Sequence, residues 1–291
     1  MQSDRRNAFL ALTAAGALWG LTIPFSKLAL EWLGPFSLAV ARFAVAAPLL
    51  GLVARGSLRA ALTWRAVLWG AVFYGAGVAL QNAAVERTSV THAALIVATV
   101  PAFVALFAAA RGRSSATPQA WLGFLLAIGG VGLVAGSGGE ESLAGDALML
   151  ASAIGSAGYV LAQPRVLAGR DPVAVTAVQM AAGAALTLPL AATEGAPPLP
   201  GLGPALWGFL GLAVAGSLLP FALYAYGQAR VVPEVAGAFV NLEPLVGALL
   251  GAFLFDDPFG ATQLLGASAL VAGLALSVVP TPPRARPRPT G

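Results

Sequence analysis

Long stretches without a charged residue constrain the fold of this chain more than any other feature. They have 20 to 35 residues each and cover residues 66–85, 88–110, 114–139, 172–193, 195–229 and 258–283. A helix needs about 20 apolar residues to cross the hydrocarbon core of a bilayer. Only 10% of the 291 residues are charged, whereas soluble proteins carry roughly a quarter. The sequence therefore predicts an all-α membrane protein.

Gly, Pro and charged residues divide the apolar sequence into ten predicted transmembrane helices with short connections. The predicted spans lie near residues 8–30, 35–54, 65–85, 90–110, 118–137, 145–163, 172–192, 204–226, 234–255 and 261–279.

The distribution of basic residues predicts how these helices are oriented. With the N-terminus inside, 13 of the 16 Lys and Arg residues fall on the cytoplasmic side: Arg5, Arg6, Arg55, Arg59, Arg65, Arg111, Arg113, Arg165, Arg170, Arg230, Arg284, Arg286 and Arg288. The outer loops hold Arg87 and most of the acids: Glu31, Glu86, Glu140, Glu141, Glu194, Asp256 and Asp257. This bias is typical of cytoplasmic loops. We expect a multi-pass protein of the bacterial inner membrane with both termini in the cytoplasm. The high pI then reflects orientation in the bilayer rather than a nucleic-acid partner.

The two halves of the chain repeat each other with a shift of 143 residues. Residues 80–101 align with residues 223–244, so that Arg87 falls on Arg230 and Pro101 on Pro244. Five crossings per copy place the second copy upside down, an architecture common in secondary transporters. The sequence predicts two inverted five-helix repeats, at 1–141 and 142–291, the second ending in a short basic cytoplasmic tail.

Two charged residues inside predicted helices are candidates for substrate binding, because charges are costly in a bilayer. Glu243 lies near the middle of its helix, between Asn241 and Pro244, and Pro244 leaves carbonyl groups one turn earlier without a donor. These groups suit an ammonium ion or a proton, although Glu243 bonded to a hydroxyl would serve packing alone. Arg42 suits a substrate carboxylate, a pair with Glu243, or an outward-pointing position. Gln179 is the repeat partner of Arg42.

Other polar and aromatic residues are candidate cavity walls: Gln81, Asn82, Tyr159, Gln163, Tyr224 and Tyr226. Trp19 lies deep in the first helix, where it either stacks on substrate or packs. Lys27 and His92 lie near outer helix ends, and a hydrogen-bonded or gate position is expected for His92. Helix bending during transport is expected at prolines, chiefly Pro24, Pro101 and Pro244.

Several classes of function are excluded by missing residues. The chain has no Cys and one His, so we expect no metal site and no cofactor. It has no P-loop, G-x-S-x-G or H-E-x-x-H motif. We therefore expect neither an enzyme nor an ATP-driven pump.

The chain resembles the drug/metabolite transporter superfamily, in its EamA-type branch. The resemblance rests on residues 17–27 (ALWGLTIPFSK), residues 100–130 and residues 242–257 (LEPLVGALLGAFLFDD). It implies two inverted repeats that export small metabolites by alternating access, and the pattern is similar to the aromatic amino-acid exporter group. It also implies a central cavity among helices 1–4 and 6–9, within reach of Trp19, Asn82, Tyr159, Gln179, Tyr224 and Asn241. The chain departs from the family where its fourth helix ends in Arg111-Gly-Arg113 instead of an acidic residue.

We expect an exporter of amino acids, with aromatic and other large neutral ones favoured. A multidrug or amphiphile exporter is the alternative, and a membrane enzyme or scaffold is a more distant one. The sequence leaves open whether the protein is a monomer or a homodimer.

Overall fold

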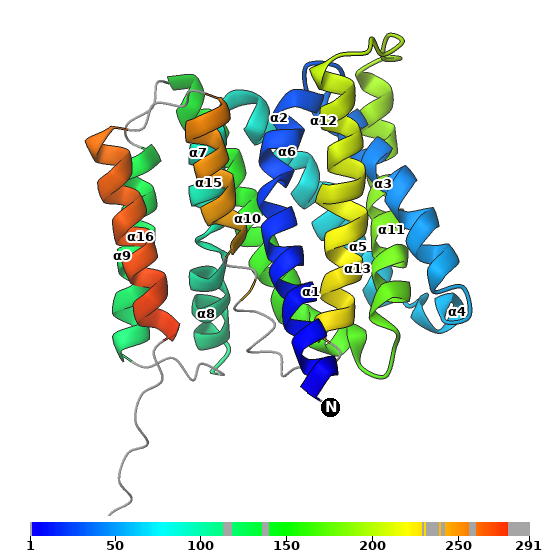
Figure 1. Cartoon of the computed structure of the whole chain (residues 1–291), viewed down its shortest axis with the longest axis horizontal. Coiled ribbons are helices and arrows are strands. Elements are labelled where there is room, and N and C mark those ends of the chain that lie inside the picture. Colours follow the sequence, from blue (N-terminus) through cyan, green and yellow to red (C-terminus); the bar gives the residue numbers. More distant parts are fainter. Residues whose placement is uncertain are drawn as a thin grey trace, which may run out of the picture.

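The computed structural model describes residues 2–112, 118–135, 140–228, 230, 239, 242–255 and 260–278. Within these ranges every regular element is a helix, and the helices are packed side by side (Figure 1). Seven helical stretches are long and apolar enough to cross a membrane, and three shorter apolar helices accompany them. The prediction of an all-α membrane protein is confirmed for the described residues.

Most of the apolar stretches in the first half are built from more than one helical segment. The elements are α1 (Gln2–Gly20), α2 (Thr22–Ala29), α3 (Pro35–Val53), α4 (Leu58–Ala61), α5 (Trp64–Gly70), η1 (Ala71–Gly77), α6 (Val78–Arg87), α7 (Val90–Val97), α8 (Val100–Ala110) and α9 (Pro118–Ala135). The segment η1 is a π-helix that joins α5 to α6 without a break.

The second half contains a matching π-helix. Its elements are α10 (Glu140–Leu167), α11 (Pro172–Thr193), α12 (Pro204–Ala213), η2 (Val214–Leu218), α13 (Leu219–Gln228), α15 (Leu242–Leu254) and α16 (Ala261–Val278). The two π-helices begin at Ala71 and Val214, which are separated by the same 143 residues as the sequence repeat. Of the span predicted near 234–255, the structure describes Phe239 and α15.

Local sequence explains where several helices begin. Proline occupies the first turn of α3, α11 and α12, where its missing N–H costs nothing. Asp171 caps α11 by accepting from the N–H groups of Val173 at 2.8 Å and Ala174 at 3.2 Å. Glu194, which follows α11, caps the start of α3 and so joins the two helices at one end of the bundle.

Several of the contacts between helices have counterparts in the other half. The helix α1 packs against α13 and α15, and α10 packs against α6 and α8, which occupy the corresponding places in the other half. The helices α3 and α11 pack against each other, as do α9 and α16. The α9–α16 pair lies at the edge of the bundle, on the left in Figure 1.

One close contact depends on the absence of a side chain. A Cβ atom on Gly183 of α11 would lie 2.5 Å from the Cβ of Tyr74 and 2.6 Å from its carbonyl carbon. Gly183 therefore lets α11 approach η1 closely, which places Tyr74 in the core of the bundle.

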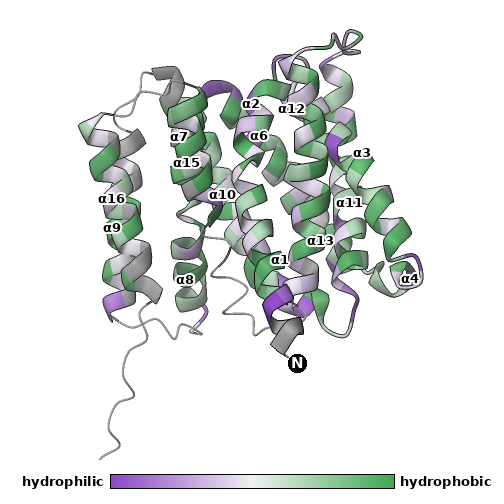
Figure 2. Cartoon of the chain, viewed as in Figure 1, coloured by the Kyte–Doolittle hydropathy of each residue, from purple (hydrophilic) through white to green (hydrophobic). Residues whose placement is uncertain are grey.

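Many of the hydrophilic residues lie towards the two ends of the bundle, while apolar residues cover most of its length (Figure 2). The N-terminus and α4 lie at the same end (Figure 1). Arg55 precedes α4, Arg59 lies within it, and Arg111 follows α8 at this end, which we call the basic end. Glu31 and Glu194 occupy loops at the opposite, acidic end. Arg87 also lies there, 2.9 Å from the carboxylate of Glu86.

Candidate functional site

The π-helix η2 holds the guanidinium group of Arg42 inside the bundle. Arg42 Nε donates to Ser217 Oγ at 2.9 Å and Nη2 donates to the Gly216 carbonyl at 3.2 Å. Ser217 Oγ in turn donates to the Leu212 carbonyl, five residues earlier, at 2.9 Å. This is the spacing of a π-helical turn. The wide turn therefore supplies acceptors that position the arginine.

One nitrogen of this buried cation has no acceptor. Arg42 is 3% exposed and its Nη1 atom has no hydrogen-bond partner. No carboxylate of the described residues lies within 4.0 Å of the guanidinium, although Glu243 is near enough to interact with it electrostatically. Arg42 therefore neither points outward nor forms a close ion pair with Glu243, which were two of the three possibilities considered from the sequence. An unpaired buried charge is costly, so the free N–H of Arg42 makes this position a candidate for binding an anion.

Aromatic side chains from five segments form a continuous cluster in the core. We call the following residues the aromatic cluster: Trp19, Phe43, Phe73, Tyr74, Tyr159, Phe221 and Tyr224. Tyr74 is central, with ring centroids 5.3 Å from Phe43 and 5.5 Å from Phe221. Trp19 lies 5.1 Å from both Phe221 and Tyr224. The cluster is a large apolar surface that also carries hydroxyl groups.

Arg42 belongs to the same region of the bundle. It precedes Phe43 of the aromatic cluster, and its guanidinium carbon lies 5.1 Å from the centre of that ring. A positive charge and a set of aromatic faces are thus neighbours.

A chain of hydrogen bonds extends the aromatic cluster towards α11. Tyr159 Oη donates to Gln179 Oε1 at 3.2 Å and lies 3.3 Å from Tyr74 Oη. Because a tyrosine hydroxyl has one proton, Tyr74 is the donor to Tyr159. The amides of Gln163 and Gln179 pair reciprocally at 3.2 Å. The polar groups of this buried network are therefore mutually satisfied.

The structure brings together most, but not all, of the residues singled out from the sequence. Trp19 and Tyr224 are in contact, and so are Tyr159 and Gln179. Asn82 joins α6 to α3 by donating to the Pro35 carbonyl at 2.9 Å.

Two further candidate residues, Asn241 and Glu243, belong to the region where α15 begins. Glu243 is in the first turn of α15, where its backbone carbonyl approaches Gly20 of α1. Asn241 falls outside the described residues.

Two of the three candidate bending prolines follow helix interruptions, and the third lies at the start of α15. Pro24 lies in α2, shortly after the break at Leu21. Pro101 lies in the first turn of α8, after the break that follows Val97. Pro244 is buried in the first turn of α15.

Sequence reasoning missed Phe43, Phe73, Tyr74, Ser217 and Phe221. Phe43, Phe73 and Phe221 are ordinary for an apolar helix, and nothing in their spacing marks them. Ser217 gains its importance from the π-helical turn. Tyr74 had a detectable signal, since it is a polar aromatic residue in the middle of a predicted span.

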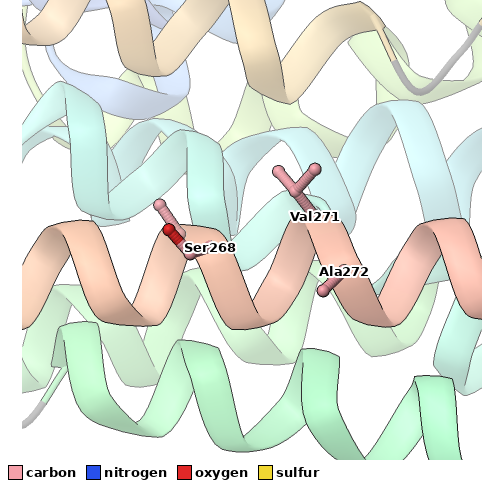
Figure 3. A pocket seen from close by; sticks show the side chains of 4 residues that line it. Ser268, Val271 and Ala272 are labelled. Atoms are coloured by element: carbon pink, nitrogen blue, oxygen red, sulfur yellow. The ribbon is translucent and has the colours of Figure 1, made fainter.

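A depression on α16 is not part of this site. Ser268, Val271 and Ala272 line it together with Ala267, and its volume is about 410 Å³ (Figure 3). It belongs to the α9–α16 pair at the bundle edge. Elsewhere, the described residues contain no group of three or more His, Asp or Glu side chains that could hold a metal ion.

The fold and the buried site define a helical membrane transporter. The model of the EamA-like transporter family matches residues 6–136 and again residues 143–279. The chain belongs to the EamA-like transporter family, within the drug/metabolite transporter superfamily, so the resemblance seen in the sequence is confirmed.

Individual relatives agree with this assignment. An uncharacterized transporter of Archaeoglobus fulgidus is 26% identical over 94% of this chain and 98% of its own length. The uncharacterized inner membrane transporter YedA of Escherichia coli K12 is 29% identical over 92% of this chain and 89% of its own. The threonine/homoserine exporter RhtA of Salmonella typhimurium is 30% identical over 60% of this chain and 57% of its own. A solved structure matches 93% of this chain and 96% of its own with a TM-score of 0.68 at 21% identity, which shows a common fold.

Proposed function

We propose that this protein is a secondary transporter of the bacterial inner membrane that exports amino acids, with aromatic and other large neutral ones favoured. The observation that carries the proposal is the free N–H of Arg42 beside the aromatic cluster. An amino acid presents a carboxylate, an ammonium group and a side chain. Arg42 would bind the carboxylate, Glu243 would face the ammonium group, and the aromatic cluster would hold an apolar side chain.

The proposal includes ten membrane spans arranged as two inverted repeats, 1–141 and 142–291, that alternate access to a site between them. Three observations support the repeats. The family model matches each half separately. The two π-helices begin 143 residues apart. The contacts of α1 with α13 and α15 have counterparts in those of α10 with α6 and α8.

We further propose that the basic end of the bundle faces the cytoplasm and the acidic end faces outward. The positive-inside tendency supports this orientation. The name of YedA, an inner membrane transporter, supports the choice of membrane.

The relatives support amino acids as a class without selecting one. RhtA is named as an exporter of threonine and homoserine, which are small and polar. The aromatic cluster supports larger apolar side chains, because a ring gains more from burial against other rings. Phenylalanine and threonine are therefore the two substrates to compare.

A multidrug or amphiphile exporter is the second candidate. The faces of the aromatic cluster also suit a hydrophobic cation, for which Glu243 would supply the opposite charge. Such a substrate needs no carboxylate, so Arg42 would be dispensable for its transport.

Uptake into proteoliposomes tests these alternatives. Labelled phenylalanine, threonine and phenethylamine, the last lacking the carboxylate, are compared with and without a pH gradient. We expect saturable phenylalanine uptake that is lost in Arg42→Gln, while Arg59→Gln, an exposed arginine at the basic end, transports normally. Phenethylamine uptake that survives Arg42→Gln, with no uptake of either amino acid, would support the amphiphile exporter instead.

A further inference from the structure

The chain between α3 and α5 turns back at the basic end of the bundle, where α4 lies (Figure 1). Its backbone is held by short-range hydrogen bonds: the N–H of Ser57 donates to the Ala54 carbonyl at 2.8 Å, and that of Ala61 donates to the Ser57 carbonyl at 3.1 Å. The side chain of Thr63 accepts from the N–H of Ala66 at 3.2 Å and so fixes the start of α5. The connection is therefore an ordered structure with defined sides.

One side of this connection is seated on the second half of the chain. An apolar cluster joins the two parts, and its buried members are Ala54, Ala61, Ala66, Val166, Ala174 and Val175. The three alanines at positions 54, 61 and 66 belong to the connection and the start of α5, whereas the other residues belong to α10 and α11. Because this side faces α10 and α11, the opposite side is held away from the bundle.

The opposite side combines basic and large apolar side chains. Trp64 is 69% exposed and Leu62 is 65% exposed. Arg55 and Arg65 are exposed as well, and the guanidinium carbon of Arg65 lies 5.3 Å from the centre of the Trp64 ring. Arg59 of α4 is also exposed and adds a further positive charge. We call Arg55, Leu62, Trp64 and Arg65 the basic-aromatic face.

The sequence around the basic-aromatic face is poor in acids. There is no Asp or Glu between residues 32 and 85, so α3, α4, α5 and η1 contain none. The helices that pack on α5 from the second half are α10 and α11. Between residues 147 and 193 they contribute one acid, Asp171, whose carboxylate caps α11, together with the bases Arg165 and Arg170. The face therefore carries a net positive charge.

The apolar part of the face continues the surface of a membrane-spanning helix. Leu52 and Val53, in the last turn of α3, are exposed, and Arg55 follows two residues later. The face thus begins where the apolar surface of α3 ends. Trp favours the boundary between hydrocarbon and water, so this position suits a lipid better than a partner in solution.

The arginines add a preference for one kind of lipid. A guanidinium group forms paired, charge-assisted hydrogen bonds with a phosphate. Phosphatidylcholine carries a compensating cation beside its phosphate, whereas phosphatidylglycerol has a net negative charge. Basic residues next to a membrane-spanning helix attract anionic lipids, so charge complementarity favours the anionic headgroup.

We propose that the basic-aromatic face binds the headgroup of an anionic phospholipid. Arg55 and Arg65 contact the phosphate, Trp64 lies at the boundary between headgroup and hydrocarbon, and Leu62 packs against the acyl chains. Under the proposed orientation of the bundle this lipid belongs to the cytoplasmic leaflet, while the binding itself depends neither on the orientation nor on the transported substrate.

The expected preference follows from the two arginines. One basic residue near an anionic surface changes the affinity for that surface about fivefold. Two such residues would give about 25-fold, and screening by salt lowers this value. We therefore expect phosphatidylglycerol to be preferred over phosphatidylcholine about tenfold.

Quenching of Trp64 fluorescence by brominated lipids measures this preference directly. The purified protein is placed in vesicles that contain phosphatidylcholine and phosphatidylglycerol, and bromine is attached near the headgroup end of the acyl chains of one lipid or the other. The chain has six Trp residues, so the signal of Trp64 is taken as the difference between the unaltered chain and Trp64→Phe. The quenching by each lipid, at equal proportions, gives the preference of the site.

Substitutions separate charge from packing. Replacing Arg55 and Arg65 together by Gln should remove the preference for phosphatidylglycerol, whereas replacing both by Lys should keep it, because Lys retains the charge. Arg87→Gln, which removes an exposed arginine at the acidic end, is the matched control and should leave the preference unchanged.

Three results would overturn the proposal. Equal quenching of Trp64 by both lipids would show that the face does not select an anionic headgroup. A lack of quenching by either lipid would show that the face does not contact the bilayer and has another partner. A preference that survives the Gln substitutions would show that these two arginines do not bind the headgroup. Since no substrate is transported in this measurement, its outcome is separate from that of the proposed export of amino acids.

Discussion

Replacing Ser217 by Ala tests whether the π-helix η2 positions Arg42 for a substrate carboxylate. The substitution removes the 2.9 Å hydrogen bond from Arg42 Nε and leaves the bond from Nη2 to the Gly216 carbonyl. A hydrogen bond to a charged group contributes about 1.5–3 kcal/mol. About 1.4 kcal/mol corresponds to a tenfold change in an equilibrium constant. Because the bond to the Gly216 carbonyl still holds Arg42, we expect the loss to be at the low end of this range. The affinity for a substrate carboxylate should therefore fall about tenfold.

The expected loss is selective for substrates with a carboxylate. The affinity for phenylalanine should fall in Ser217→Ala, whereas that for phenethylamine should not, because the amine does not contact Arg42. Competition against labelled phenylalanine in proteoliposomes measures both. Ser156→Ala is the matched control, since this hydroxyl also bonds to a helix carbonyl, that of Ser152, at 2.9 Å. Equal effects on both ligands, or no effect on phenylalanine, would refute the positioning role of Ser217.

Two further predictions concern packing and coupling. Gly183→Ala should lower the thermal stability of the purified protein, because the new Cβ would lie 2.5 Å from the Cβ of Tyr74. Gly155→Ala is the control, since a Cβ atom there meets open space. Equal melting temperatures for the two variants would contradict this reasoning. Glu243→Gln should abolish the dependence of phenylalanine uptake on a pH gradient if Glu243 carries the coupled proton, and an unchanged dependence on pH would remove Glu243 from coupling.

The sequence was most informative where physical constraints are strong and local. Charge-free runs locate helices because a bilayer cannot solvate charges. The same argument singled out Arg42, which the structure places in the core. Proline at helix starts, as at Pro35 and Pro172, also fixed boundaries closely.

The partners of these residues could not be predicted in the same way. The bond between Arg42 and Ser217 joins residues 175 positions apart, and it depends on a π-helical turn for which single-sequence patterns give no signal. The contact of Tyr74 with Tyr159 likewise depends on how closely η1 and α10 approach. Asp146 is different, because an acidic residue inside the span predicted at 145–163 could have been recognised from the sequence as a buried polar position.

The paired π-helices carry a consequence for the ancestry of the chain. A π-helical turn holds one residue more than an α-helical turn, so its presence amounts to an insertion. Under the proposed duplication, an insertion shared by η1 and η2 was already present in the single ancestral gene segment. Because the wide turn absorbs the extra residue, deleting one residue from η2 would restore an α-helical turn and leave α12 and α13 in register. The deletion would instead remove the five-residue spacing between Leu212 and Ser217, and with it the hydroxyl that holds Arg42.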